Sequence, residues 1–243
     1  SDHLITDVVE FQRVINSSLR FVADSDAILT IGIKPTRPET GFGYIEAALG
    51  NASLSNKEIF RVDSFKEKPD IDTATTYISK KNFYWNSGVF IWNVQTVVNA
   101  FRIYQPQIAQ IFESLLPYYG TEEEPALLAE NYPYCRNISV DYAILEHADE
   151  VFVFPAEFGW SDLGTWGSLY THVEKDENQN AIIGMKNVSM IESTNCIVRA
   201  SGDIKMVLQG LDNYIVADDN GILMVCQKDQ EQRIKSFSET LKD

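Results

Sequence analysis

Two aspartates occupy positions from which they could hold a divalent cation. Asp2 lies just before an expected helix, and Asp162 lies in a glycine-flanked turn directly before another. Phosphoryl and nucleotidyl transfers usually need a hard cation, held near the phosphates by a few oxygen ligands. On spacing alone, a helix cap or a solvated loop explains Asp162 better than a metal site does, because Asp is favoured at such positions. The carboxylates therefore predict either a magnesium site or ordinary helix starts.

Two short motifs could bind a polar ligand. The glycines of Gly41-Phe42-Gly43-Tyr44 would let backbone amides approach a ligand beside an aromatic ring, although a hairpin turn explains them equally well. Glu67 and Lys68 follow an expected strand. They form either an exposed ion pair or a site in which the carboxylate binds sugar hydroxyls and the ammonium binds a phosphate.

Asn86-Ser87-Gly88 interrupts an otherwise apolar strand, residues 83–92. Buried amides and hydroxyls need hydrogen-bond partners. A polar ligand would supply them.

Helical and extended patterns alternate in the first part of the chain. Because helices and buried strands follow one another, we expect an α/β fold with a largely parallel sheet and helices on its faces. The expected helices span residues 7–21, 70–80, 94–104, 107–116, 122–130, 140–147 and 166–173, and the expected strands span 27–33, 59–65, 83–92 and 151–154.

The pattern changes after residue 178. Short β-rich runs separated by Gly, Asn and Asp follow, and residues 230–241 could form a closing amphipathic helix. We therefore expect one domain over residues 1–178 and a smaller β-rich domain over 179–243, built as a β-helix or a small sandwich.

Composition narrows the class of partner. A formal charge of −15 disfavours nucleic acid and anionic membranes as partners, whereas a local cation could still bind a phosphorylated substrate. No apolar run reaches the length of a membrane span and no basic signal-peptide start is present, so the cytoplasm is the expected location. The scattered cysteines and histidines predict neither disulfides nor a zinc site.

Six motifs in a consistent order resemble mannose-1-phosphate guanylyltransferases (GDP-mannose pyrophosphorylases), a family of sugar nucleotidyltransferases. They are SDHLI (1–5), RPETGFGYIE (37–46), FKEKPD (65–70), WNSGVF (85–90), SVDYA (139–143) and WSDLGTW (160–166). The resemblance implies a Rossmann-like nucleotidyltransferase domain followed by a small β-rich domain. The latter is often a short left-handed β-helix used in dimer contacts, so a homodimer is expected.

The resemblance also implies roles for particular residues. It implies that Asp2 and Asp162 hold the catalytic Mg²⁺, so we expect them to meet at the carboxyl edge of the sheet. The other implied contacts are the loop beside the nucleotide sugar (Gly43, Tyr44 and Glu46), the mannose hydroxyls (Glu67), the sugar phosphate (Lys68) and the hexose pocket (Asn86, Ser87 and Gly88). We expect the pocket residues to come from two neighbouring strands. We interpret Asp141 as a residue that starts a helix rather than as one that contacts a ligand.

The implied reaction is attack of a mannose-1-phosphate oxygen on the α-phosphate of GTP, which gives GDP-mannose and pyrophosphate. Members of the family open with a glycine-rich GGxGxRLxP loop that holds GTP, and no such run occurs here. We therefore expect a chain that lacks its N-terminal GTP-binding part and does not catalyse the transfer alone.

Two alternatives stay open. One is a thymidylyl- or uridylyltransferase that acts on another hexose-1-phosphate. The other is a non-catalytic subunit that senses a sugar nucleotide, although a sensor has no need for an aspartate pair.

Overall fold

The structure, a computed structural model, describes residues 3–53, 55–184, 187–200 and 204–240. The chain forms two compact units. We call residues 5–160 the closed-sheet unit, and residues 161–240 together with His3 and Leu4 the coil unit. Within the described ranges, no helix combines the length and apolar character needed to cross a bilayer.

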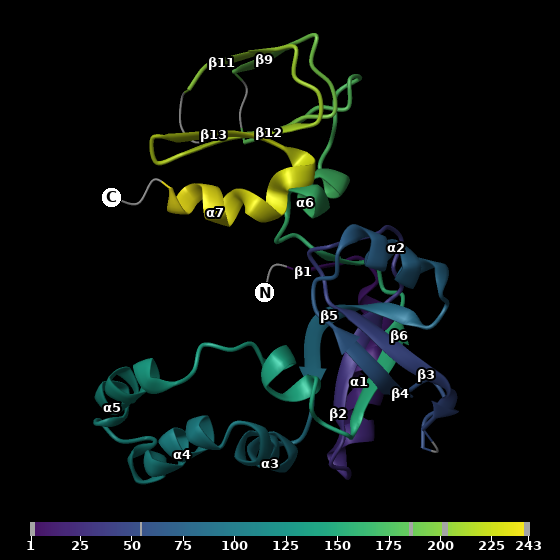
Figure 1. Cartoon of the computed structure of the whole chain (residues 1–243), viewed down its shortest axis with the longest axis vertical. Helices are drawn as coiled ribbons and strands as arrows, with labels where there is room; N and C mark the ends of the chain where they lie inside the picture. The colour runs from purple at the N-terminus through teal and green to yellow at the C-terminus, as the bar shows by residue number, and fades with distance from the viewer. Residues whose placement is uncertain (1–2, 54, 185–186, 201–203, 241–243) are drawn as a thin grey trace. The chain divides into compact units, whose positions relative to one another are not determined.

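The closed-sheet unit alternates strands with helices. Its elements in chain order are α1 (Val8–Ala23), β2 (Ile28–Ile33), β3 (Tyr44–Ala52), β4 (Phe60–Lys66), α2 (Ile71–Ser79), β5 (Phe83–Ile91), α3 (Val94–Tyr104), α4 (Pro106–Ser114), the 3₁₀ turn η1 (Leu116–Tyr118), α5 (Glu124–Asn131), the 3₁₀ turn η2 (Tyr132–Tyr134), the π-helical turn η3 (Asp141–Leu145) and β6 (Val151–Ala156). Figure 1 shows α3, α4 and α5 grouped on one side of the strands.

The strands form one sheet in the order β2-β5-β3-β4-β6, which closes because β6 pairs with both β4 and β2. The β2–β6 pair is parallel, and the four other pairs are antiparallel. The prediction of a largely parallel sheet is therefore wrong. A loop without a helix joins β3 to β4, and a short loop can only turn a strand back beside its predecessor.

Alternate residues of the strands enter two hydrophobic cores. On β2, Leu29 and Ile31 pack in the core that includes Val14 and Val22 of α1. Ile28 packs in the other core, together with residues of α3 and η3. Helix α1 begins as its sequence predicts, because the Asp7 carboxylate accepts a hydrogen bond from the N–H of Glu10.

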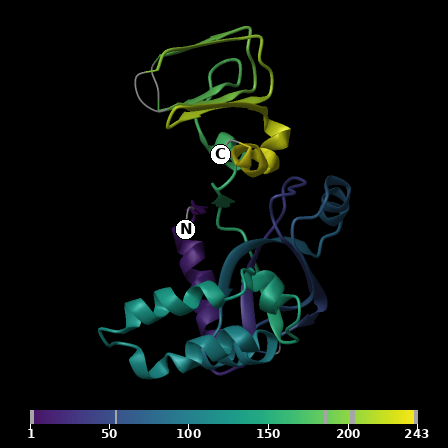
Figure 2. The same cartoon turned by 60° about the vertical axis from the view of Figure 1, so that its left-hand side comes forward.

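The coil unit is rich in short strands, as predicted. Its elements are β8 (Ala181–Ile183), β9 (Val188–Ile191), β10 (Ile197–Arg199), β11 (Met206–Gln209), β12 (Tyr214–Asp219), β13 (Ile222–Gln227), the helices α6 (Trp166–His172) and α7 (Ile234–Glu239), and the 3₁₀ turn η4 (Lys228–Arg233); in addition, β1 (His3–Ile5) pairs with β7 (Trp160–Asp162). Figure 2 shows α7 beside the stacked strands.

The strands of the coil unit repeat at regular positions. β8, β10 and β12 stack in parallel, and so do β9 and β11. Gln179, Asn195 and Asn213 each precede one of the stacked strands and all have positive φ, at 61°, 56° and 63°. Parallel stacking with a recurring left-handed corner is the arrangement of a β-helix.

The two compact units divide after Trp160, earlier in the chain than the boundary expected at residue 178. Helix α6 accounts for the difference. Its residues Trp166, Leu169 and Tyr170 pack against the core of the coil unit, which includes Ile197 and Ile215.

Candidate functional site

Three segments of the closed-sheet unit meet at Gly43, just before β3. The carbonyl of Gly43 accepts a 2.8 Å hydrogen bond from the N–H of Asn86 on β5. A Cβ atom at Gly43 would collide with Oε2 of Glu67, which follows β4, and would lie 3.3 Å from the Cβ of Asn86. A side chain at this position would therefore displace the Glu67 carboxylate and press against Asn86, so glycine leaves room for both.

The side-chain amide of Asn86 has a defined orientation. Its Nδ2 donates to Oδ1 of Asp141 over 3.0 Å, and its Oδ1 accepts from Oγ1 of Thr30 at 3.2 Å and from the N–H of Gly88 at 3.1 Å. An amide oxygen has two lone pairs and an amide nitrogen has two protons. One N–H of Asn86 thus has no hydrogen-bond partner within the described part of the chain.

Glu67 is half-buried in an acidic environment. Burial raises the pKa of its carboxyl, the charges of Asp141 and Glu146 raise it further, and Lys68 opposes them. Lys68 is exposed and has a φ of +46°. The arrangement places an acceptor for hydroxyl groups, the spare N–H of Asn86 and a nearby cation within one region of the unit.

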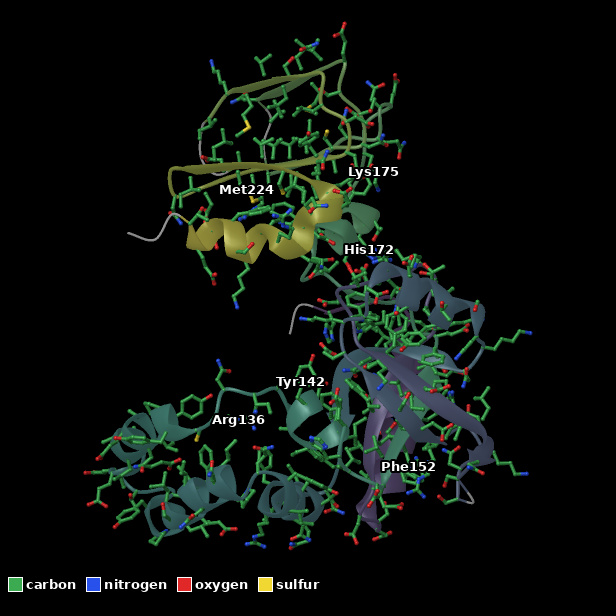
Figure 3. All side chains as sticks on the ribbon, in the orientation of Figure 1. Arg136, Tyr142, Phe152, His172, Lys175 and Met224 are labelled. Carbon is green, nitrogen blue, oxygen red and sulfur yellow. The ribbon has the colours of Figure 1, made fainter. Side chains whose placement is uncertain are left out.

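Tyr142 on η3 lies close to the same carboxylates. Burial raises the pKa of its phenol, and the charges of Glu67, Glu146 and Asp141 add to the effect. The side chain is 45% exposed, so a ligand at the surface could reach it. Figure 3 shows Tyr142 on the segment that follows α3, α4 and α5.

The expectation that the pocket comes from two neighbouring strands is wrong. β3 lies between β4 and β5 in the sheet, so Glu67 and Asn86 belong to strands that are not adjacent. They meet because Gly43, at the start of the intervening strand, has no side chain to separate them.

Ser87 does not offer its hydroxyl to a ligand. The side chain is 2% exposed, donates to the carbonyl of Ile31 and accepts from the N–H of Val89. The protein itself therefore supplies the partners that a ligand was expected to supply. Gly88 is exposed, with a φ of +70°, in a bulge of β5 against β2, which explains a glycine inside a strand.

The structure also corrects the expectations for Tyr44 and Glu46. Tyr44 is fully buried in the core with α1 and α2, and its hydroxyl accepts from the N–H of Glu39, so its ring cannot stand beside a nucleotide sugar. Glu46 is two residues along β3 from Tyr44 and therefore on the same face, opposite to that of Ile45. Its carboxylate accepts from Ser64 and Asn82.

Asp141 is the residue whose contact the sequence interpretation missed. We expected a helix-start residue, and Asp141 does lie in the first turn of η3. Its carboxylate, however, bonds to Asn86, which is 55 positions earlier in the chain. Its place in the SVDYA motif was the available signal.

The proposed metal ligands are described only in part. Asp2 lies outside the described residues. Asp162 ends β7, which pairs with β1, and its Oδ1 accepts from the N–H of Gly164 at 2.8 Å. Within the described ranges, His, Cys, Asp and Glu form no group of three or more that could hold a metal. The chemistry of Asp162 still fits Mg²⁺, which needs one or two protein carboxylates in addition to water and phosphate oxygens.

A separate hollow of about 650 Å³ lies at the carboxyl ends of β2 and β6, beside Lys80 and Lys81. It contains none of the residues that meet at Gly43. Its two glutamates are paired, Glu10 with Arg13 and Glu157 with Lys34.

The closed sheet with its helices gathers polar side chains at one place, and parallel β coils follow it in the chain. Comparison with known proteins identifies the class. The sequence profile of the nucleotidyl transferase family matches residues 1–179, and the chain belongs to this family.

Individual relatives are more specific. The chain is 30% identical over its whole length to the mannose-1-phosphate guanylyltransferase RfbM of Salmonella typhimurium, of which it covers 49%. It is 32% identical to the xanthan biosynthesis protein XanB of Xanthomonas campestris, again over its whole length and over 50% of that protein. The chain thus spans about half the length of the curated relatives it matches.

A solved structure has the same fold. It comes from Thermus thermophilus, is described as a mannose-1-phosphate geranyltransferase and is 27% identical to this chain. The match has a TM-score of 0.78 and covers 100% of this chain and 68% of the other. The predicted α/β nucleotidyltransferase fold is therefore confirmed.

Proposed function

We propose that this chain provides the sugar-phosphate site of a mannose-1-phosphate guanylyltransferase, which transfers GMP from GTP to mannose-1-phosphate and releases pyrophosphate. The convergence of Glu67 and Asn86 over Gly43 carries the proposal, because it joins hydrogen-bonding groups from distant segments over a residue whose lack of a side chain leaves room for both. Membership of the nucleotidyl transferase family and the names of the relatives support it.

Each residue has a distinct task in this proposal. The Glu67 carboxylate accepts hydrogen bonds from mannose hydroxyls, the spare N–H of Asn86 donates one, and Lys68 offsets the charge of the sugar phosphate. These contacts fix the phosphate oxygen for in-line attack on the α-phosphate of GTP. Positioning of this kind can contribute about 7–11 kcal/mol to lowering a reaction barrier.

Magnesium belongs to the proposal as well. Asp162, together with Asp2, would hold Mg²⁺, which supplies charge neutralisation at the reacting phosphates. Titration with Mn²⁺ as a paramagnetic substitute should broaden NMR signals around Asp162 in the wild type and should do so less in Asp162→Asn. Equal broadening in both proteins would exclude Asp162 as a ligand.

From the resemblance alone, we also propose that the chain forms a homodimer through its β-rich coil unit. Sedimentation of the whole chain tests this contact. A monomer at the highest concentration used would contradict it.

Calorimetry on this chain tests the sugar site. Mannose-1-phosphate should bind more tightly than glucose-1-phosphate, its C2 epimer. Glu67→Gln and Asn86→Ala should each weaken mannose-1-phosphate binding by about tenfold. The first removes a charged hydrogen-bond acceptor for the mannose hydroxyls, and the second removes a hydrogen-bond donor. Asp149→Asn, at an exposed carboxylate outside the site, is the matched control. Wild-type affinity in both site variants would place the pocket elsewhere.

A further inference from the structure

We infer that Asp141 is a positioning residue of the sugar site, which acts by holding the Asn86 amide in the one orientation that directs an N–H to the ligand. The inference rests on the proposed function and adds a residue to its site. Asp141 lies on η3, whereas the other residues around Gly43 come from the strands or their ends.

The two neighbours of the amide select its orientation in opposite ways. The backbone N–H of Gly88 can only donate, so it requires the Asn86 oxygen at 3.1 Å. The Asp141 carboxylate can only accept, so it requires the Asn86 nitrogen at 3.0 Å. A flipped amide would set N–H against N–H and carbonyl against carboxylate. Thr30 adds no selection, because its hydroxyl can donate or accept.

Removal of Asp141 removes half of this selection. The Asn86 nitrogen then loses its acceptor, and only the N–H of Gly88 still selects the native orientation, so the flipped amide becomes more populated. A sugar hydroxyl that needs a donor therefore meets a mixture of orientations, and its affinity falls.

The charge of Asp141 has a second and separable effect. It raises the pKa of Glu67, as does Glu146, whereas Lys68 lowers it and the neutral phenol of Tyr142 lies nearby. Asp141→Asn keeps an oxygen that can accept from Asn86 but removes the charge. This variant should therefore retain affinity at high pH and lose it at a lower pH than the wild type does.

The experiment measures mannose-1-phosphate affinity between pH 5 and pH 8. The proteins are the wild type, Asp141→Ala, Asp141→Asn, Asn86→Ala, the Asp141→Ala/Asn86→Ala double variant and the control Asp149→Asn. The phosphate of the ligand titrates near pH 6 with every protein, so only differences from the wild type are interpreted.

We expect Asp141→Ala to weaken binding about tenfold at pH 8, whereas Asp141→Asn should stay within about twofold of the wild type. The double variant should bind as Asn86→Ala does, because Asp141 acts through Asn86. Additive losses of affinity in the double variant would overturn the inference. Wild-type affinity in Asp141→Ala together with weakened binding in Asn86→Ala would also overturn it. Either result leaves the proposed function standing.

The side-chain NH₂ signals of Asn86 in the NMR spectrum give a readout that needs no ligand. They should shift in Asp141→Ala and stay in place in Asp149→Asn, while backbone signals elsewhere verify folding. Unmoved signals in Asp141→Ala would refute the contact. A wild type that binds no mannose-1-phosphate would refute the proposed function instead.

Discussion

Two asparagines, each bonded to an aspartate, differ in how much of their hydrogen-bonding capacity the protein uses. Asn180, in the coil unit, is 1% exposed. Its Nδ2 donates to Oδ2 of Asp176 and to the carbonyl of Ser193, and its Oδ1 accepts from the N–H of Cys196. Asn86, in the closed-sheet unit, keeps one N–H without a partner among the described residues.

Under the proposed function, the difference separates a structural amide from a binding amide. One proton of Asn180 is bonded to Asp176, four residues earlier, and the other to Ser193 in the next coil, so its role is to join the two coils. Asn86 is only partly buried and uses its bonded groups to fix its own orientation, which leaves one donor for a ligand. An oriented side chain with an unused hydrogen-bonding group is therefore a better indication of a binding site than a polar residue inside an apolar strand.

The largest expected effect is on stability and comes from the saturated amide. Asn180→Ala leaves the N–H of Cys196 and the carbonyl of Ser193 without their partner in a buried place. Each unsatisfied group costs about 1–3 kcal/mol, so we expect a loss of about 3 kcal/mol in the free energy of unfolding. Urea denaturation measures it, with the exposed Asn178→Ala as the control. Sugar-phosphate affinity should be unchanged, and a large loss of affinity would undo the distinction between the two amides.

A smaller effect should follow from Gly43→Ala. The added Cβ would lie 3.3 Å from the Cβ of Asn86, 3.2 Å from the Phe65 ring and in collision with Glu67. Overpacking of this kind costs about 1–3 kcal/mol, and here the displaced carboxylate should also weaken mannose-1-phosphate binding. Gly50→Ala, where a Cβ meets nothing within 4 Å, is the control. If both alanine variants bind equally well, Glu67 does not contact the sugar.

The smallest effect concerns the pH dependence of stability. Burial and nearby carboxylates raise the pKa of Glu67 in the folded chain above its value of about 4.3 in the unfolded chain. Protonated Glu67 therefore stabilises the folded chain below about pH 4.3, and this contribution is lost as the pH rises through the pKa of the folded chain. Glu67→Gln should therefore be more stable than the wild type at pH 7 by only a few tenths of a kcal/mol, since water screens the half-buried group. The gain should vanish near pH 4. Equal stability of Glu67→Gln and the wild type at pH 7 would mean that burial and the neighbouring charges do not destabilise the ionised Glu67 carboxylate.

The sequence predicts the elements better than their pairing. Hydrophobic periodicity and the Asp7 cap place α1 and most other helices within a few residues, because these signals are local. Strand direction depends on which distant segments pair, and the pattern around β3 and β4 contains no sign that both run antiparallel to their neighbours.

The same limit applies to the site. The motifs identify Gly43, Glu67 and Asn86, which the structure brings together. They also nominate Tyr44 and Ser87, whose side chains are buried and bonded within the protein. Which side of a strand a residue faces, and where a bulge reverses it, is decided by tertiary packing that a motif does not record.

The most direct test of the account follows the side-chain NH₂ signals of Asn86 and Asn180 in one NMR titration with mannose-1-phosphate. Alanine variants assign both pairs of signals. The account predicts that the Asn86 signals move progressively to saturation while those of Asn180 stay in place. Saturable binding that leaves the Asn86 signals unmoved would contradict it.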